Sequence, residues 1–199
     1  MDFTTEKAFA KINISLDVTG KRPDGYHDML MVMQSVTLCD DVRVELTANR
    51  SSTAVCNLPF VPSDGRNLAV RAADSFFAAA GITGVGARIG LYKRIPVGAG
   101  MAGGSSDAAA VLRALNRLCG RPFDESGLRE LACGIGSDVP FCVTGGTMLA
   151  SGRGELLSPL PELPDCSLVI AVGGDGTAFE VACGLMDTGK PMGIIPAGT

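Results

Sequence analysis

Residues 95–109 read IPVGAGMAGGSSDAA, a run dominated by glycine, alanine and serine. Such small residues let backbone N–H groups approach a phosphate closely, and glycine permits conformations with positive φ. A helix is predicted to follow from about Ser105 to Cys119 and to end at Gly120. Its N-terminus would add unpaired N–H groups and the positive end of the helix dipole. We therefore predict a phosphate-binding loop over residues 98–104.

Several readings of this loop compete. Ser105, Ser106 and Asp107 can cap the helix, and a serine hydroxyl could also reach phosphate or its metal ion, so a simple helix cap after a loop is one reading. Residues 98–103 also fit the dinucleotide-binding pattern G-x-G-x-x-G. The second strand that this pattern requires is replaced by a helical stretch over residues 122–132. No G-K-[ST] follows, which excludes a Walker A loop and leaves an ATP loop of another type.

The flanking sequence mixes strands and helices without a regular β-α-β alternation, which favours an α+β fold. Residues 11–18 alternate apolar and polar, the period of a half-buried strand, so Lys11, Asn13 and Ser15 should share one face. Residues 20–25 are a turn signal. Asn67 is a candidate N-cap for a helix to Ala80. Further strands are predicted over residues 29–39, 41–47, 85–93, 141–150 and 168–172.

The composition is that of a globular protein with a real core. The 199 residues are 46% hydrophobic and 19% charged, with a net charge of −4, which argues against broad binding to nucleic acid. The seven cysteines are odd in number and form no C-x-x-C pair, so reduced thiols in a cytoplasmic protein are expected rather than disulfides or a zinc site. Neither a secretory signal nor a membrane span is visible, so no membrane partner is expected.

The loop resembles the central motif of the GHMP kinases, and in particular that of the 4-diphosphocytidyl-methylerythritol kinases. Three other segments are similar to motifs of the same family and occur in its order: residues 8–16 (AFAKINISL), 22–27 (RPDGYH) and 136–141 (GSDVPF). Together the resemblance covers roughly residues 6–172. Ala102 departs from the pattern, since many relatives have glycine there.

The resemblance implies a fold and a reaction. The fold is α+β, with a GHMP kinase N-terminal ATP-binding domain, similar to ribosomal protein S5 domain 2, over residues 1–160. The incomplete start of a second domain is expected over residues 161–199. The implied reaction is ATP-dependent phosphorylation of the 2-hydroxyl of 4-diphosphocytidyl-2-C-methyl-D-erythritol, in non-mevalonate isoprenoid precursor synthesis. ATP and Mg²⁺ are the implied cofactors, with a small-molecule substrate, no nucleic-acid partner and no protein metal ligand.

The resemblance also assigns site residues. Asp138 is the general base for the substrate hydroxyl, and Lys11 is its cationic partner near the γ-phosphate. Tyr26 and His27 recognise the cytosine ring, and Asn13 contacts a substrate hydroxyl or phosphate. Without the resemblance, each residue would more often be an ordinary strand, turn or surface residue. The residues assigned to ATP binding are Asn67, Lys93, Pro96, Gly98, Ala99, Gly100, Met101, Ala102, Gly103, Gly104, Ser105 and Ser106.

The last part of the chain resembles a different family. Residues 173–177 read GGDGT and residues 191–199 read PMGIIPAGT, a series similar to the ATP-binding core of diacylglycerol kinase-like lipid kinases. We therefore predict a junction near Val172, after which a fragment of a second kinase follows. The apolar run 192–196 is expected to borrow a strand partner from the first domain or to remain partly exposed. Two alternatives stay open: a lipid kinase, supported by this tail alone, and a truncated nucleotide-binding module without turnover.

Overall fold

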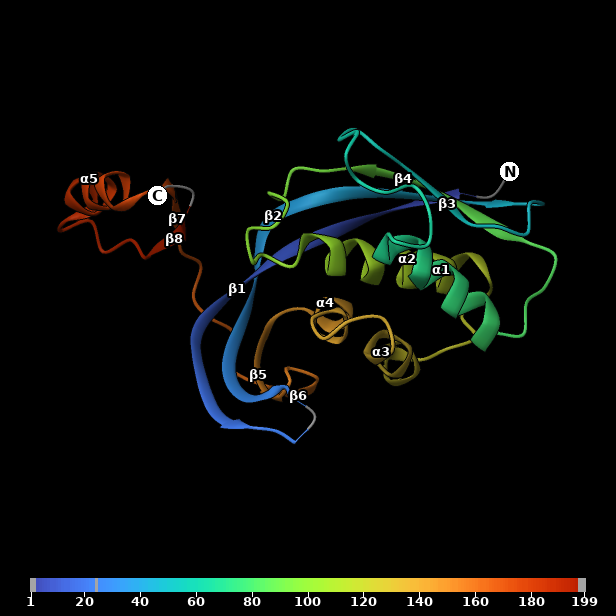
Figure 1. Cartoon of the computed structure of the whole chain (residues 1–199), viewed down its shortest axis with the longest axis horizontal. Helices are drawn as coiled ribbons and strands as arrows, with labels where there is room; N and C mark the ends of the chain where they lie inside the picture. The colour runs from blue at the N-terminus through green and yellow to red at the C-terminus, as the bar shows by residue number, and fades with distance from the viewer. Residues whose placement is uncertain (1–2, 24, 197–199) are drawn as a thin grey trace. The chain divides into compact units, whose positions relative to one another are not determined.

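The computed structural model describes residues 3–23 and 25–196 (Figure 1). The chain divides into two compact units, residues 1–161 and residues 162–199. The two units are described separately below.

A six-stranded sheet forms the frame of the first unit. Its longest strand, β2 (His27–Thr47), pairs antiparallel with β1 (Phe3–Lys21) along most of its length. On the other edge of β2, residues 41–47 pair with β4 (Gly86–Tyr92) and residues 29–34 pair with β5 (Thr147–Gly152). Two short strands complete the sheet, whose order is β3-β4-β2-β5-β6 with β1 beside β2. These are β3 (Thr53–Cys56), parallel to β4, and β6 (Leu156–Pro159), antiparallel to β5.

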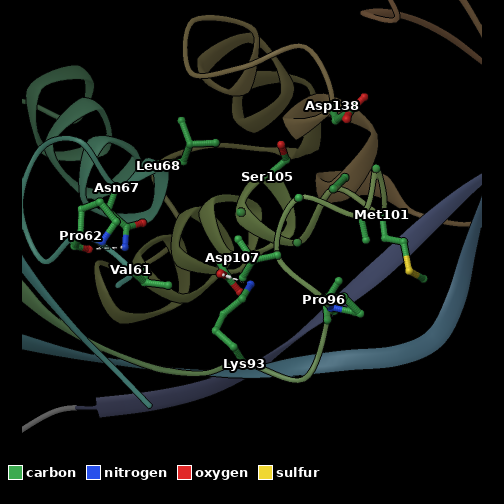
Figure 2. A pocket seen from close by; sticks show the side chains of 18 of the residues that line it. Val61, Pro62, Asn67, Leu68, Lys93, Pro96, Met101, Ser105, Asp107 and Asp138 are labelled. Atoms are coloured by element: carbon green, nitrogen blue, oxygen red, sulfur yellow. Dashed lines mark hydrogen bonds and ion pairs between the residues drawn. The ribbon is translucent and has the colours of Figure 1, made fainter. Parts of the chain in front are cut away.

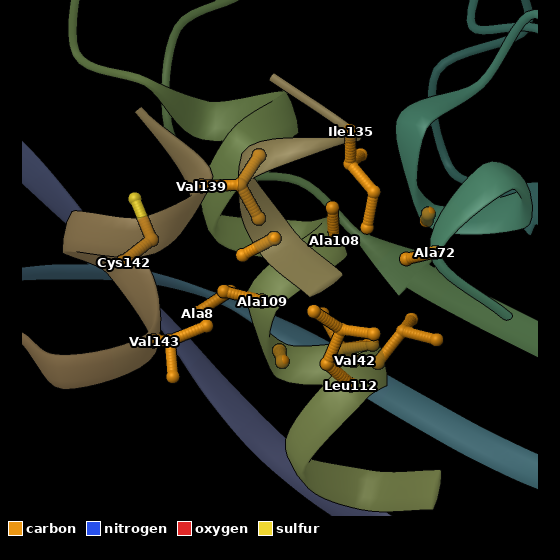
Figure 3. Packing of buried hydrophobic residues seen from close by; sticks show 14 of the residues in the cluster. Ala8, Val42, Ala72, Ala108, Ala109, Leu112, Ile135, Val139, Cys142 and Val143 are labelled. Carbon is orange, nitrogen blue, oxygen red and sulfur yellow. The ribbon is translucent and has the colours of Figure 1, made fainter. Parts of the chain in front are cut away.

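Four helices lie together on one side of this curved sheet (Figure 1). They are α1 (Leu68–Ala79), α2 (Gly103–Leu118), α3 (Glu125–Cys133) and α4 (Val139–Thr144). Helix α2 is the central one, and every residue from Ser106 to Leu112 is buried. Figure 3 shows Leu112 and Ala108 of α2 among side chains from β1, β2, α1 and α4, so the core lies between the sheet and the helices. This packing fixes the N-terminus of α2, where the glycine-rich loop ends.

The structure corrects several local predictions. Residues 29–39 and 41–47 form one strand, β2, and β3 and β6 were not predicted. Residues 141–144, predicted as the start of a strand, are helical because Pro140 favours a helix start and Gly145, with φ of 74°, ends the helix. β-Bulges on either side of Lys11 and Asn13 interrupt the alternation predicted for residues 11–18.

The start of α2 also differs from the prediction. The N-cap is Ala102, which makes no side-chain capping bond, and the helix begins at Gly103. Ser105 and Ser106 lie inside the first turn and Asp107 follows it, so none of the three is the N-cap and the reading that they cap the helix is wrong. The last two of these side chains are buried.

The second unit is a β-α-β arrangement of β7 (Val169–Gly173), α5 (Asp175–Leu185) and β8 (Met192–Pro196). Strands β7 and β8 pair in parallel in a two-stranded sheet, so residues 192–196 do not borrow a partner from the first domain. The other expected outcome holds, because β8 remains partly exposed, with Ile194 at 54%. The unit packs thinly. None of the residues of α5, all of which the structure describes, is buried, and Phe179 is 70% exposed. The predicted motif's last residues, 197–199, lie outside the described residues.

Candidate active site

The glycine-rich loop borders a cavity of about 430 Å³ in the first unit (Figure 2). Gly98, Gly100 and Ala102 have φ of 77°, 72° and 57°, so three residues of the loop adopt the left-handed conformation before α2 begins. Glycine adopts this conformation freely, whereas alanine is strained by about 1–2 kcal/mol. Lys93 and Asp138 also line the cavity. Further lining residues come from residues 60–68 and from α2: Phe60, Val61, Pro62, Asn67, Leu68, Ser105 and Asp107.

The geometry of this cavity suits a phosphate chain. The N-terminus of α2, at Gly103, opens on the cavity, and a helix of this length presents unpaired N–H groups and positive dipole charge there. The loop is held from behind, because the backbone N–H of Lys11 donates to the carbonyl of Met101 at 3.1 Å. Backbone groups rather than long side chains therefore form the floor of the cavity.

Eleven of the twelve residues predicted to bind ATP line this cavity, and Ser106 is the exception. Its hydroxyl is buried and donates to the carbonyl of Phe9 at 2.6 Å, so it ties α2 to β1 instead. Asn67 lines the cavity but also caps α1. Its Oδ1 accepts from the N–H of Ala69 at 3.0 Å, and its Nδ2 donates to the carbonyl of Pro62 at 2.8 Å.

Lys93 is also less available than the sequence suggested. Its ammonium nitrogen lies 2.5 Å from Asp40 Oδ2 and 2.6 Å from Asp107 Oδ2, and all three residues are buried. Burial lowers the pKa of Lys93, but the two carboxylates outweigh it and hold that pKa above its usual value. Burial raises the pKa of Asp107 to about 7, against the pull of the Lys93 charge.

A second cavity, of about 390 Å³, contains the three residues predicted to bind substrate, Asn13, Tyr26 and His27. Lys11 lines it as well, and Asp138 lines both cavities. The carboxylate of Asp138 is therefore reachable from both cavities. Lys11 and Asp138 line the second cavity together, whereas only Asp138 of the two lines the cavity at the N-terminus of α2.

Lys11 and Asp138 come from β1 and from the residue before α4. The ammonium nitrogen of Lys11 lies 3.8 Å from Asp138 Oδ2 and donates to Asn13 Oδ1 at 3.2 Å. The Lys11 side chain is only 6% exposed, and that of Asp138 is 33% exposed. Lys11 is thus a buried cation held beside a half-exposed carboxylate, an arrangement that can stabilise negative charge while the carboxylate accepts a proton.

Sequence reasoning missed one charged residue of the second cavity, Arg153. Its guanidinium carbon lies 5.1 Å from the centroid of the Tyr26 ring, and it makes a long ion pair of 4.0 Å with Glu155. The only available signal was the turn sequence of residues 151–155, SGRGE, because the antiparallel pairing of β5 with β2 is what brings Arg153 to Tyr26. Among residues 3–23 and 25–196, no cluster of three His, Cys, Asp or Glu side chains could hold a metal ion.

Comparison with known proteins agrees with this geometry. Residues 67–146, which contain the loop, α2 and Asp138, match the family of GHMP kinases N terminal domains. A crystal structure of 4-(cytidine 5'-diphospho)-2C-methyl-D-erythritol kinase superposes with a TM-score of 0.65 at 44% identity, covering 79% of this chain and 55% of the other. The first unit of this chain is thus similar to the GHMP kinases in sequence and in fold. The predicted α+β fold is confirmed.

Curated GHMP kinases are closely similar in sequence. A Gloeobacter violaceus protein named 4-diphosphocytidyl-2-C-methyl-D-erythritol kinase is 51% identical over 165 residues, covering 83% of this chain and 54% of the relative. A Geobacillus kaustophilus protein of the same name is 52% identical over 170 residues, covering 83% and 57%. The chain thus spans little more than half the length of these relatives. Homoserine kinase from Cytophaga hutchinsonii, at 21% identity and a TM-score of 0.60, shares the fold.

The end of the chain matches a different family. Residues 152–199 match the diacylglycerol kinase catalytic domain, so the second resemblance is also confirmed. This match starts before the predicted junction near Val172 and includes the whole second unit. No helix in the described part of the chain is long and apolar enough to cross a membrane.

Proposed function

We propose that this chain is the nucleotide-binding and catalytic part of an ATP-dependent kinase that phosphorylates the 2-hydroxyl of 4-diphosphocytidyl-2-C-methyl-D-erythritol. The observation that carries the proposal is the position of Asp138, which lines both cavities and lies beside the buried Lys11. A base that faces a nucleotide cavity on one side and a substrate cavity on the other is what phosphoryl transfer to a hydroxyl requires. The names of relatives about half identical in sequence support the substrate.

In this proposal each group of residues has a separate role in the reaction. The loop N–H groups and the α2 N-terminus hold the ATP phosphates. Asp138 accepts the proton of the substrate hydroxyl, and Lys11 stabilises the charge that develops on the transferred phosphoryl group. Asn13 orients Lys11 and the substrate. Mg²⁺ would enter with ATP and neutralise phosphate charge, and the cavity fits it because the hydroxyl of Ser105 offers an oxygen ligand of the kind that it prefers.

The second cavity is proposed to hold the cytidine diphosphate portion of the substrate. The ring of Tyr26 can stack on a base, and His27 can read the hydrogen-bonding edge of cytosine. Lys11 and Arg153 are cations in the same cavity, which suits a diphosphate.

Three further proposals concern the chain as a whole. The domain limits are 1–160 and 161–199, and the reaction belongs to isoprenoid precursor synthesis. The protein is cytoplasmic, which is consistent with its seven free cysteines.

Replacing the base tests the proposal. Asp138→Asn keeps the size of the side chain but removes the proton acceptor, so kcat with the cytidylylated sugar alcohol should fall roughly 10²–10⁴-fold. The dissociation constant for ATP should stay within about threefold, since the loop is untouched. The matched control is Asp124→Asn. Asp124 is the exposed N-cap of α3, and asparagine retains an oxygen that can cap the helix. An unchanged kcat in Asp138→Asn would remove Asp138 from the role of base.

Two other activities are separated by the same assay. The diacylglycerol kinase match favours a lipid kinase, so diacylglycerol is tested beside the sugar alcohol. Phosphorylation of diacylglycerol would identify the tail as a working catalytic segment. Binding of ATP without turnover of either acceptor would instead identify a truncated nucleotide-binding module.

A further inference from the structure

A buried cluster of three charged residues joins the two ends of the phosphate loop. Asp40 lies on β2, Lys93 follows β4 at the start of the loop, and Asp107 is the fifth residue of α2, which begins where the loop ends. The Lys93 ammonium nitrogen is 2.5 Å from Asp40 and 2.6 Å from Asp107, and the three residues are 8%, 0% and 3% exposed in the order Lys93, Asp40, Asp107. Figure 2 shows Lys93 and Asp107 meeting beneath the loop.

The start of the loop is fixed by more than the ion pair. Asp40 Oδ1 accepts hydrogen bonds from the backbone N–H groups of Arg94 and Ile95, the latter at 2.8 Å. The side chain of Asn57 bonds both backbone groups of Lys93, accepting from its N–H at 2.8 Å and donating to its carbonyl at 3.2 Å. The backbone that enters the loop is therefore bonded on both sides.

The end of the loop is in direct contact with this start. A Cβ atom added to Gly103 would lie 3.1 Å from the Lys93 ammonium nitrogen and 3.1 Å from Ile95 Cγ2. Gly103 can therefore approach so closely because it lacks a side chain. Lys93 thus links the first residues of the loop to the N-terminal part of α2, with the phosphate-facing residues 96–102 spanning the two.

We propose that Asp40, Lys93 and Asp107 are positioning residues that hold the two ends of the phosphate loop at a fixed spacing and thereby set the affinity for the nucleotide triphosphate. Lys93 acts through the two carboxylates, not through a contact with the nucleotide. The inference deepens the proposed function and rests on it. Buried ion pairs contribute little net stability because of their desolvation cost, so the value of this cluster lies in placement.

The electrostatics of the cluster agree with a positioning role. Asp107 faces Lys93 and, across it, Asp40, and its Oδ1 has no hydrogen-bond partner among the described residues. Burial raises the pKa of Asp107 to about 7, and the charge of Asp40 adds to that rise. Because the ionised form of Asp107 places negative charge at the edge of an anion site, removing that charge alone would favour ATP. A loss of affinity on substitution must therefore come from loop geometry.

A pair of variants separates geometry from charge. Asp107→Ala and Asp107→Asn remove the same charge, but only the asparagine retains an oxygen that can accept from Lys93. We expect Asp107→Ala to bind ATP at least tenfold more weakly than Asp107→Asn, as measured by titration calorimetry on the whole chain. Binding of CDP, a probe of the second cavity, should stay within twofold in wild type and both variants. General damage to the fold would change both affinities together.

Hydrogen exchange of the backbone amides of residues 98–104 is the second measurement. We expect these amides to exchange at least tenfold faster in Asp107→Ala than in Asp107→Asn. If the alanine variant does not fold, Asp40→Asn is measured instead. In Asp40 one carboxylate oxygen accepts from Lys93 and the other accepts from the loop N–H groups, whereas asparagine has a single oxygen and cannot serve both. Weaker ATP binding and faster loop exchange than in wild type are expected there too.

The outcomes are distinct. Equal ATP affinity in the alanine and asparagine variants, tighter binding by the alanine variant, or equal loop exchange would each overturn the positioning role. Failure of the wild-type chain to bind ATP would overturn the proposed function instead. In that case loop exchange alone would decide whether the cluster holds the loop.

Discussion

The N-cap of α1 offers a quantitative test of how the nucleotide cavity is built. Asn67 is 8% exposed and both ends of its amide are bonded: Oδ1 accepts from the N–H of Ala69, and Nδ2 donates to the carbonyl of Pro62. The first bond caps the helix, and the second holds residues 60–62, which form one wall of the cavity. Replacing Asn67 with alanine removes both bonds, whereas serine is expected to keep only the cap.

The two bonds give an expected magnitude. Loss of an asparagine N-cap costs about 1 kcal/mol. Loss of the bond to Pro62 costs about another 1 kcal/mol. Asn67→Ala should therefore lower the free energy of unfolding by about 2 kcal/mol, and Asn67→Ser by about 1 kcal/mol. For a chain of this size, these changes correspond to falls in Tm of roughly 4–8 °C and 2–4 °C.

Urea unfolding followed by far-UV circular dichroism measures these changes. The slope of the unfolding free energy against urea concentration must be equal in the wild type and the two variants. The first unit contributes most of the helical signal, since four of the five helices of the described chain, α1 to α4, lie in it. Equal destabilisation by serine and alanine would show that the bond to Pro62 contributes nothing. A loss below about 0.5 kcal/mol for alanine would refute the capping argument itself.

Three further predictions concern the loop, the second cavity and the tail. Gly103→Ala should weaken ATP binding at least tenfold, because its Cβ would lie 3.1 Å from Lys93 Nζ. Gly104→Ala is the control. The nearest neighbour of its Cβ would be at 3.8 Å, so it should change ATP binding less than threefold in the same calorimetric titration. Arg153→Ala should weaken CDP binding about tenfold and leave ATP binding unchanged, and equal effects on both ligands would contradict its placement. Residues 173–196 should show lower hydrogen-exchange protection than α2, since no residue of α5 is buried, and equal protection would contradict this.

The parts of the fold that could be predicted are those with local signals. Start and stop signals mark the glycine-rich loop, α2 and α1: small residues, an asparagine cap and closing glycines. Strands β3 and β6 have only four residues each, too few to show a period, and they form because β4 and β5 present an edge to them. The short helix α4 was read as a strand because its apolar run has no period of its own and packs against α2.

The site shows the same division between local and distant information. The resemblance to a family identified Lys11 and Asp138 as a pair, although they are far apart in the chain. No pattern indicated that Lys93 would be shared by Asp40 and Asp107, which lie 53 and 14 residues away from it. Such partners depend on how β2, β4 and α2 pack, so only the folded structure reveals that the lysine faces inward.

The start of α2 explains why three adjacent polar residues do different things. Successive helical residues point about 100° apart, so Ser105, Ser106 and Asp107 face different neighbours. Ser105 lines the cavity, Ser106 bonds the carbonyl of Phe9 on β1, and Asp107, at the edge of the cavity, binds Lys93. The glycines and alanines before this turn shape a backbone surface for phosphate, and two of the three polar side chains anchor that surface to the sheet. A motif that reads as a set of phosphate contacts is therefore, in large part, the attachment of the loop to the fold.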